Sequence, residues 1–179
     1  MSGWYALYSK WHHEKKVAEF LHSKNIEAYL PLISRRQRWK DRYKWVDFPL
    51  FPSYVFVYCE MAAAKNLLSR VRGVISIVGS PGPELIPSQQ ILSIKKVIET
   101  GVPFEHTVDL LIGQEVLVVK GPLKGIHGIL VEKRNKNLLL IKVDLINQGI
   151  SIIIEKEAVI PYRIDSPTPC TVINESGFG

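Results

Sequence analysis

The sequence lacks the residues and runs that several classes of protein require. Its two cysteines, Cys59 and Cys170, are too few for a disulfide framework or a cysteine-based metal site, and we expect both thiols to be reduced. No apolar run is long enough to cross a bilayer, and the N-terminal residues have neither the basic nor the apolar region of a signal peptide. We therefore expect a cytoplasmic protein with no membrane association.

Catalytic and metal-binding patterns are missing as well. His12 and His13 adjoin each other and His22 is isolated, so no arrangement of nucleophile, histidine and acid and no metal-ligand spacing occurs. The His12-His13 pair fits the start of a helix better than a metal site. The sequence thus predicts a protein that is not an enzyme and that uses no cofactor and no metal.

The positive charge is concentrated in one half of the chain. Residues 1–100 contain 15 Lys and Arg against 8 Asp and Glu, whereas residues 101–179 contain 8 against 9. A chain of 179 residues can form one or two domains, and two halves with different net charge favour two domains with different partners.

One stretch, residues 49–57 (PLFPSYVFV), organises the first half. Alternation after Pro52 places Tyr54, Phe56 and Tyr58 on one face of a strand and Val55 and Val57 on the other. Because both faces are apolar, we expect a strand inside a sheet, with helices on its aliphatic side. The aromatic side either belongs to the core or meets a partner, and the pattern alone leaves both interpretations open.

Strands and helices alternate on either side of that stretch. Ser88 is a candidate N-cap for the last helix, which should end before Gly101. The order of elements predicts an α+β sandwich of the split βαβ type over residues 1–100. The expected elements are strands at 4–8, 27–32 and 74–78 and helices at 12–24, 61–71 and 88–100.

Residues 34–46 interleave basic and aromatic side chains. Six Lys and Arg accompany Asp41, and three aromatic residues lie among them. This pattern predicts a two-stranded hairpin that turns near Lys40-Asp41-Arg42. Cations and rings suit phosphates and bases, but a solvated hairpin without a nucleic-acid role fits the pattern equally well.

The second half has a different character. Five short runs rich in Ile, Leu and Val lie between residues 111 and 163 and are separated by turn residues, which predicts a small all-β barrel. We expect residues 101–110 to form a linker and residues 164–179 to form a disordered tail.

Two motifs resemble a known family. Residues 118–128 (VVKGPLKGIHG) are similar to a KOW motif, in which Gly125 and Gly128 permit a backbone that a Cβ would obstruct. Residues 4–8, 13–17, 49–57 and 72–74 resemble, in the same order, motifs of the NusG N-terminal domain. Together they resemble the NusG/RfaH (Spt5-related) family over roughly residues 3–163. The run at 49–57 and Leu145-Ile146-Asn147 are similar to the specialised antiterminators of polysaccharide operons, and Ser53 stands where the general factor usually has glycine.

The resemblance implies a bacterial transcription elongation and antitermination factor that suppresses pausing and termination. Its N-terminal (NGN) domain would bind the clamp helices of the largest RNA polymerase subunit, and its KOW barrel, of the SH3-like kind, would recruit a partner such as a small-subunit ribosomal protein. The matching polymerase-binding positions are Tyr8, Phe51, Pro52, Tyr54 and Phe56.

The resemblance also implies contact with the non-template DNA strand. Matching positions are Lys10, Trp11, His13, Lys16 and Arg72, with Trp11 either a stacking residue or a half-buried surface residue. Ile146 matches a partner-binding position in the barrel, unless it belongs to the core. We expect a monomer. The alternatives are a general NusG that binds Rho and a KOW-containing, ribosome-associated RNA-binding protein.

Overall fold

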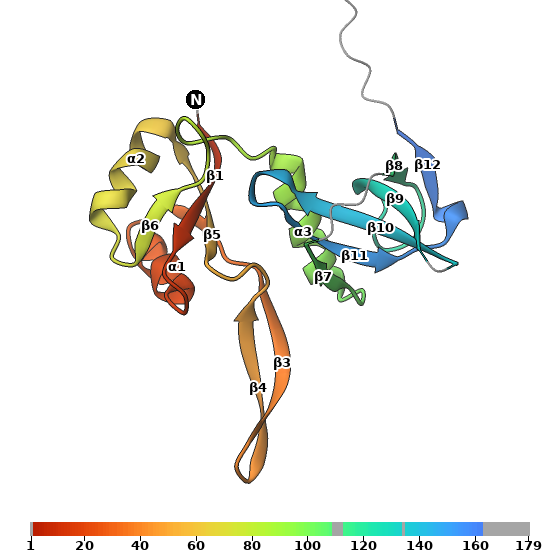
Figure 1. Cartoon of the computed structure of the whole chain (residues 1–179), viewed down its shortest axis with the longest axis horizontal. Coiled ribbons are helices and arrows are strands. Elements are labelled where there is room, and N and C mark those ends of the chain that lie inside the picture. The colour runs from red at the N-terminus through yellow and green to blue at the C-terminus, as the bar shows by residue number, and fades with distance from the viewer. Residues whose placement is uncertain (1, 109–112, 134, 163–179) are drawn as a thin grey trace, which may run out of the picture.

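The computed structural model describes residues 2–108, 113–133 and 135–162 and contains two packed parts and a projecting hairpin (Figure 1). The first part contains strands β1 (Ser2–Ser9), β2 (Glu27–Tyr29), β5 (Tyr54–Glu60) and β6 (Val74–Ile77) and helices α1 (Glu14–Ser23), α2 (Met61–Arg70) and α3 (Ser88–Thr100). The hairpin consists of β3 (Leu32–Trp39) and β4 (Arg42–Pro49).

The N-terminal sheet has the strand order β2-β5-β1-β6, and its neighbouring strands pair antiparallel. Strands β1 and β2 are connected through α1 and separated by β5, which is the split βαβ arrangement expected from the sequence. The α+β class is therefore confirmed, with β5 in the interior of the sheet.

Helices α1 and α2 cover the aliphatic face of β5, as predicted (Figure 1). Val55 and Val57 are fully buried in one cluster with Leu7 of β1, Val17 of α1 and Ala64 of α2. Alternation along two paired strands thus supplies one continuous apolar surface, which the apolar stripes of the two helices cover.

The opposite face of the sheet contacts α3. Ile91, Ile94 and Val97 of α3 are fully buried in a second cluster with Phe56 of β5 and Trp4 of β1. This cluster continues into the C-terminal part, because it also contains buried residues of the second sheet. Helix α3 lies between the two parts of the molecule (Figure 1).

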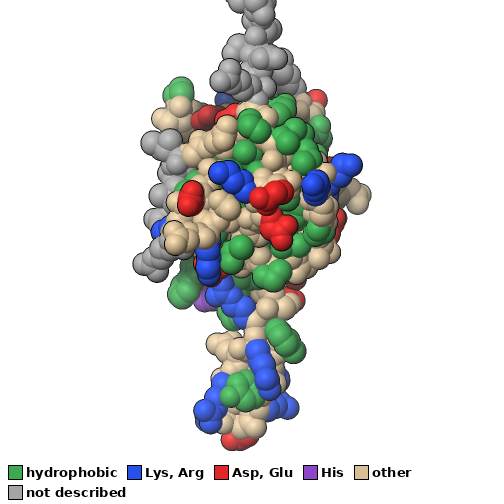
Figure 2. All heavy atoms as spheres, turned by 90° about the vertical axis from the view of Figure 1, so that its right-hand side faces the viewer, with side chains coloured by type: hydrophobic (Ala, Val, Ile, Leu, Met, Phe, Trp, Pro, Cys, Tyr) green, Lys and Arg blue, Asp and Glu red, His purple; other side chains and the backbone are tan. Residues whose placement is uncertain are grey.

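The basic segment forms the expected hairpin. Strands β3 and β4 pair from Leu32↔Pro49 to Trp39↔Arg42, so Lys40 and Asp41 make the turn. Only the root is partly buried, where Ile33 packs against the core cluster. Figure 2 shows Lys and Arg side chains and hydrophobic side chains side by side over the hairpin.

The C-terminal part is an antiparallel six-stranded sheet in the order β12-β8-β9-β10-β11-β7, which confirms the all-β region. Among the described residues the two end strands, β12 and β7, do not pair with each other. The strands are β7 (Glu105–Thr107), β8 (Gln114–Val118), β9 (His127–Lys133), β10 (Lys136–Val143), β11 (Gln148–Ile153) and β12 (Val159–Pro161), with short 3₁₀ helices η1 (Asp144–Ile146) and η2 (Lys156–Ala158).

The structure differs from the expected linker. Residues Glu105–Thr107, inside the segment 101–110, form β7 and pair with β11, so this segment adds an edge strand to the second sheet. Extended backbone next to an unpaired strand edge gains ladder hydrogen bonds, which composition alone does not reveal. The expected tail at 164–179 lies outside the described residues.

Two helix starts also differ from the sequence prediction. Helix α1 begins at Glu14 rather than at His12, because His12 has a left-handed backbone with φ of 62°. Ser88 is the first residue of α3, and Pro87 occupies the N-cap without a side-chain cap. The Ser88 cap prediction was therefore wrong by one position.

Candidate interaction surfaces

The aromatic face of β5 continues across β1. The register places Tyr8 opposite Tyr54, Ala6 opposite Phe56 and Trp4 opposite Tyr58. The rings of Tyr8 and Tyr54 lie 5.5 Å apart, as do those of Trp4 and Tyr58 at the other end. Small Ala6 in the middle leaves room for Phe56, which is fully buried under α3.

The aromatic face is partly exposed at its two ends and buried in the middle. Tyr8 and Tyr58 are each 38% exposed, whereas Phe56 is 0% exposed. Tyr54 is half-buried, and burial, followed by the neighbouring Tyr8 phenol, raises its pKa. Of the residues predicted to bind polymerase, those at the Tyr8 end offer surface and Phe56 belongs to the core.

The turn before β5 also combines a buried residue with an exposed one. Phe51 is fully buried and packs edge-on against Phe56 with ring centroids 6.0 Å apart, and the His106 ring of β7 lies 5.9 Å from it. Pro52 is exposed. Tyr54 closes the turn by donating its backbone N–H to the Phe51 carbonyl at 3.2 Å.

Glu14, which sequence reasoning did not select, holds this turn through Ser53. Ser53 has φ of 68°, in the left-handed region that favours glycine. The Ser53 N–H donates to Oε1 of Glu14 at 2.8 Å, and Glu14 is only 2% exposed. The one signal in the sequence is an acidic residue at the start of α1, and that is ordinary for helices.

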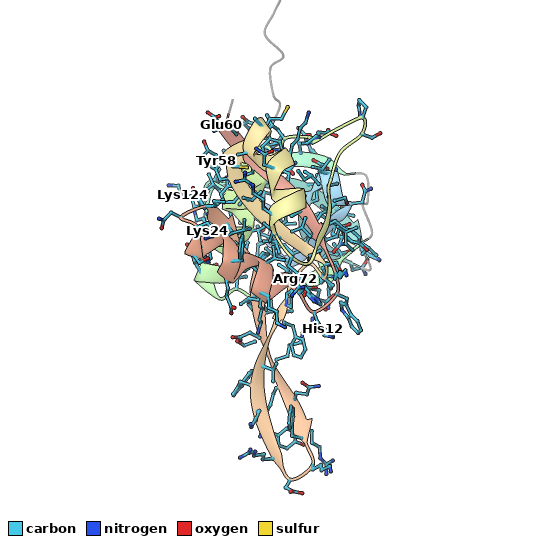
Figure 3. The ribbon with its side chains drawn as sticks, turned by 90° about the vertical axis from the view of Figure 1, so that its left-hand side faces the viewer. His12, Lys24, Tyr58, Glu60, Arg72 and Lys124 are labelled. Atoms are coloured by element: carbon cyan, nitrogen blue, oxygen red, sulfur yellow. The ribbon has the colours of Figure 1, made fainter. Side chains whose placement is uncertain are left out.

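The structure brings most of the predicted nucleic-acid residues together. The Lys10 backbone N–H donates to the carbonyl of Gly73 at 2.8 Å, beside Arg72, and His13 packs against Gly73, where an added Cβ would lie 3.2 Å from it. Lys10 and Arg72 are exposed. Figure 3 shows Arg72 and His12 at the same end of the domain, opposite Tyr58 and Glu60.

Trp11 and Lys16 complete this surface. Trp11 is 69% exposed, so it is not the half-buried residue that the sequence left as an alternative, and its ring lies 4.1 Å from that of His12. Lys16 is exposed in the first turn of α1. The loop that carries Lys10 adjoins the Tyr8 end of the aromatic face, because Ser9 N–H donates to the Ser53 carbonyl at 2.8 Å.

Helix α3 contacts the N-terminal sheet through one side and the C-terminal sheet through another. Toward the N-terminal sheet, the Lys95 ammonium lies 4.8 Å from the Trp4 ring centroid and 4.9 Å from that of Tyr29. Toward the C-terminal sheet, Gln90 donates to Asp144 Oδ2 at 2.5 Å and accepts from the Asp144 N–H at 3.2 Å. The pairing of one side chain with both groups of Asp144 fixes η1 against α3.

Ile146, in η1, is only 6% exposed and belongs to the core cluster that α3 shares. The expectation of an exposed contact residue was therefore wrong at this position, and the core alternative applies. The 3₁₀ turn directs this apolar side chain inward, and Asn147 after it takes φ of 51° to reverse the chain.

The KOW-like segment forms the loop between β8 and β9. Gly125 has φ of 87° and donates its N–H to the Val118 carbonyl at 2.8 Å. A Cβ on Gly128 would lie 2.7 Å from both the Leu139 side chain and the Leu140 carbonyl oxygen, so neighbouring strands approach too closely for any larger residue. Both expectations for these glycines are confirmed.

Residues 2–108, 113–133 and 135–162 contain no group of three or more His, Cys, Asp or Glu that could hold a metal ion. Within those ranges no helix is both long and apolar enough to span a bilayer.

The chain thus combines an α+β domain, which carries exposed basic residues on its loops, with an all-β part. Residues 2–95 match the family model described as transcription termination factor nusG. The chain therefore belongs to the NusG family of non-enzymatic transcription factors and carries a KOW-like region after its N-terminal domain.

Solved structures similar to the chain include one of domain interaction in Thermotoga maritima NusG. It is 19% identical, the match covers 91% of this chain and 98% of that chain, and the TM-score is 0.49. The MjSpt4:Spt5 complex in conformation B is 18% identical over 88% of this chain and 95% of that chain, with a TM-score of 0.32. Membership of the family depends on the match over residues 2–95 alone.

Proposed function

We propose that this chain is an operon-specific elongation and antitermination factor of the NusG family. Its N-terminal domain binds the clamp helices of the largest RNA polymerase subunit and suppresses pausing and termination. The supporting observation is the aromatic pair formed by Tyr8, which is 38% exposed, and the half-buried Tyr54, next to the exposed Pro52 at one end of the sheet.

The buried residues have a supporting role in this proposal. Phe51 and Phe56 belong to the buried cluster against which Tyr54 packs, so they support the ring that pairs with Tyr8. An apolar surface supported in this way suits the apolar side chains of a partner helix, because ordered rings lose little conformational entropy on binding.

The second half of the proposal concerns DNA. Lys10, Trp11, His13, Lys16 and Arg72 contact the non-template strand, with cations on phosphates and the Trp11 ring available for stacking. The hydrogen bond from Ser9 to Ser53 joins this loop to the turn of the aromatic surface. A polymerase bound at Tyr8 would therefore present its displaced DNA strand to Lys10 and Arg72.

The C-terminal sheet is the partner-recruiting module in this proposal, with a small-subunit ribosomal protein as the partner. Ile146 is not part of its contact surface, because the side chain is buried. Ser53 supports the specialised branch of the family, since the chain keeps a strained serine where the general factor has glycine. The protein acts as a monomer, with domains near residues 1–100 and 111–163.

The test is capture of core RNA polymerase by the full chain and by two matched variants. Tyr8→Ala removes a ring at the proposed end, and Tyr58→Ala removes a ring of equal exposure, 38%, in an equivalent cross-strand pair at the opposite end. We expect Tyr8→Ala to lose most of the captured polymerase and Tyr58→Ala to retain it. Equal capture by both variants, or none by the wild type, would refute the proposal.

A further inference from the structure

The β3–β4 hairpin carries a surface that the proposed function leaves unused. Between Ser34 and Val46 it holds six cations and a single carboxylate, Asp41, at the tip. Every side chain from Ser34 to Trp45 is exposed. At about 3.3 Å per residue, the paired strands extend roughly 26 Å, and they project away from the body (Figure 1).

The strand register pairs basic residues with aromatic residues across the hairpin. Arg36 lies opposite Trp45 and Arg38 opposite Tyr43, so these four share one face, while Trp39 and Arg42 pair on the other. The Arg36 guanidinium lies 4.1 Å from the Tyr43 ring centroid, and the Lys44 ammonium lies 5.3 Å from that of Trp39. Each face therefore presents cations next to rings.

The exposure of the rings has no explanation in packing. Trp39 is 57% exposed, Tyr43 is 56% exposed and Trp45 is 73% exposed. In the part of the chain that the structure describes, cations lie over Trp39 and Tyr43 but not over Trp45, whose faces stay accessible. Large rings held in water on a two-stranded ribbon gain nothing for folding, which favours a role in binding.

We propose that this hairpin binds single-stranded nucleic acid, with Trp45 as the stacking ring and Arg36 and Arg38 as phosphate contacts. The excess of cations selects a polyanion, and an exposed indole selects a ligand with accessible flat faces, which a single strand offers and a duplex conceals. Asp47, at the root, accepts a hydrogen bond from Ser34 and lies away from this face's outer rungs.

This site is distinct from the two loops that carry Lys10 and Arg72. The hairpin extends beyond the end of the domain where Figure 3 places Arg72 and His12. The inference goes beyond the proposed function, and its test contains no polymerase, so either can fail without the other.

The first measurement is fluorescence anisotropy of a labelled single-stranded DNA of about 12 nucleotides titrated with the full chain. One variant combines Arg36→Gln and Arg38→Gln. The control combines Lys120→Gln and Lys156→Gln, which remove the same charge from exposed positions of the C-terminal part. At about 0.1 M salt, losing two phosphate contacts should weaken binding roughly 25-fold, with little change in the control.

The second measurement isolates stacking. Trp45→Ala should weaken single-strand binding about tenfold or more, whereas Trp45→Phe, which keeps a ring and strand propensity, should retain most of it. A duplex of the same sequence should bind more weakly than the single strand. Equal affinity of the hairpin and control double variants, unchanged affinity in Trp45→Ala, or capture of anionic vesicles without single-strand binding would each overturn the proposal.

Discussion

Replacing Glu14 with alanine should loosen the turn that places Pro52 and Tyr54. The buried Glu14 carboxylate accepts the Ser53 N–H at 2.8 Å, and Ser53 holds a left-handed backbone that costs a non-glycine residue about 1 kcal/mol. Glu14→Ala leaves that N–H without its acceptor in a partly buried position. It also removes the acidic group from the first turn of α1.

The expected loss in free energy of unfolding is about 2 kcal/mol, from a charged hydrogen bond of roughly 1.5–3 kcal/mol less the desolvation that the carboxylate no longer pays. Glu14→Gln keeps an oxygen at the acceptor position and should lose about half as much, because a neutral acceptor is weaker. Urea denaturation followed by circular dichroism measures both variants against the wild type.

Ser53→Gly provides the opposite perturbation. Glycine adopts the required φ freely, so this variant should gain up to about 1 kcal/mol, and in the Glu14→Ala background it should recover part of the loss. If Glu14→Ala and the wild type have the same urea midpoint of unfolding, the Glu14 carboxylate does not hold the turn.

Two further predictions concern one buried and one partly buried aromatic residue, Phe51 and Tyr29. Phe51→Ala should lower the free energy of unfolding by about 3–5 kcal/mol, because Phe51 is fully buried. Loss of polymerase capture by that variant would therefore report unfolding. If the variant melted at the same temperature as the wild type, the Phe51 ring would not be part of the core. Burial, and secondarily Glu99, raises the pKa of Tyr29, so the phenol ionises first in the unfolded chain and stability should fall above about pH 10. Tyr29→Phe should lose less stability than the wild type between about pH 9 and pH 11, and an identical pH profile would contradict this.

Local patterns were sufficient for most of the N-terminal part. The alternation at Tyr54–Glu60 predicted an interior strand with its aliphatic face under helices. The spacing of charged and aromatic residues predicted the hairpin with a turn near Lys40-Asp41-Arg42, and the structure places the turn at Lys40 and Asp41. These features depend on neighbours within a few positions, and such periodicities are what sequence reports most directly.

Features that depend on distant neighbours were missed. Strand β7 exists because it meets an edge of β11, and Ile146 is buried because η1 packs under α3, held by Gln90 and Asp144. Glu14 acts through Ser53, which lies 39 positions along the chain. In each case the deciding partner has no periodic relation to the residue, so no local signal could have identified it.

The sequence left the aromatic face open between a core and a partner surface, and the structure covers this face unevenly along the strands. Helix α3 covers Phe56 in the middle, whereas Tyr8 at one end stays partly exposed beside the half-buried Tyr54. The core interpretation therefore applies to Phe56, and a partner surface at the Tyr8 end is what we propose, because rings ordered by neighbouring packing lose little entropy on binding. Because exposure differs along this face, single substitutions report different properties. Changes at the buried Phe51 or Phe56 should alter stability first, whereas changes at the partly exposed Tyr8 should alter the surface. Binding experiments on this protein should therefore begin at Tyr8, with Tyr58 as the control of equal exposure.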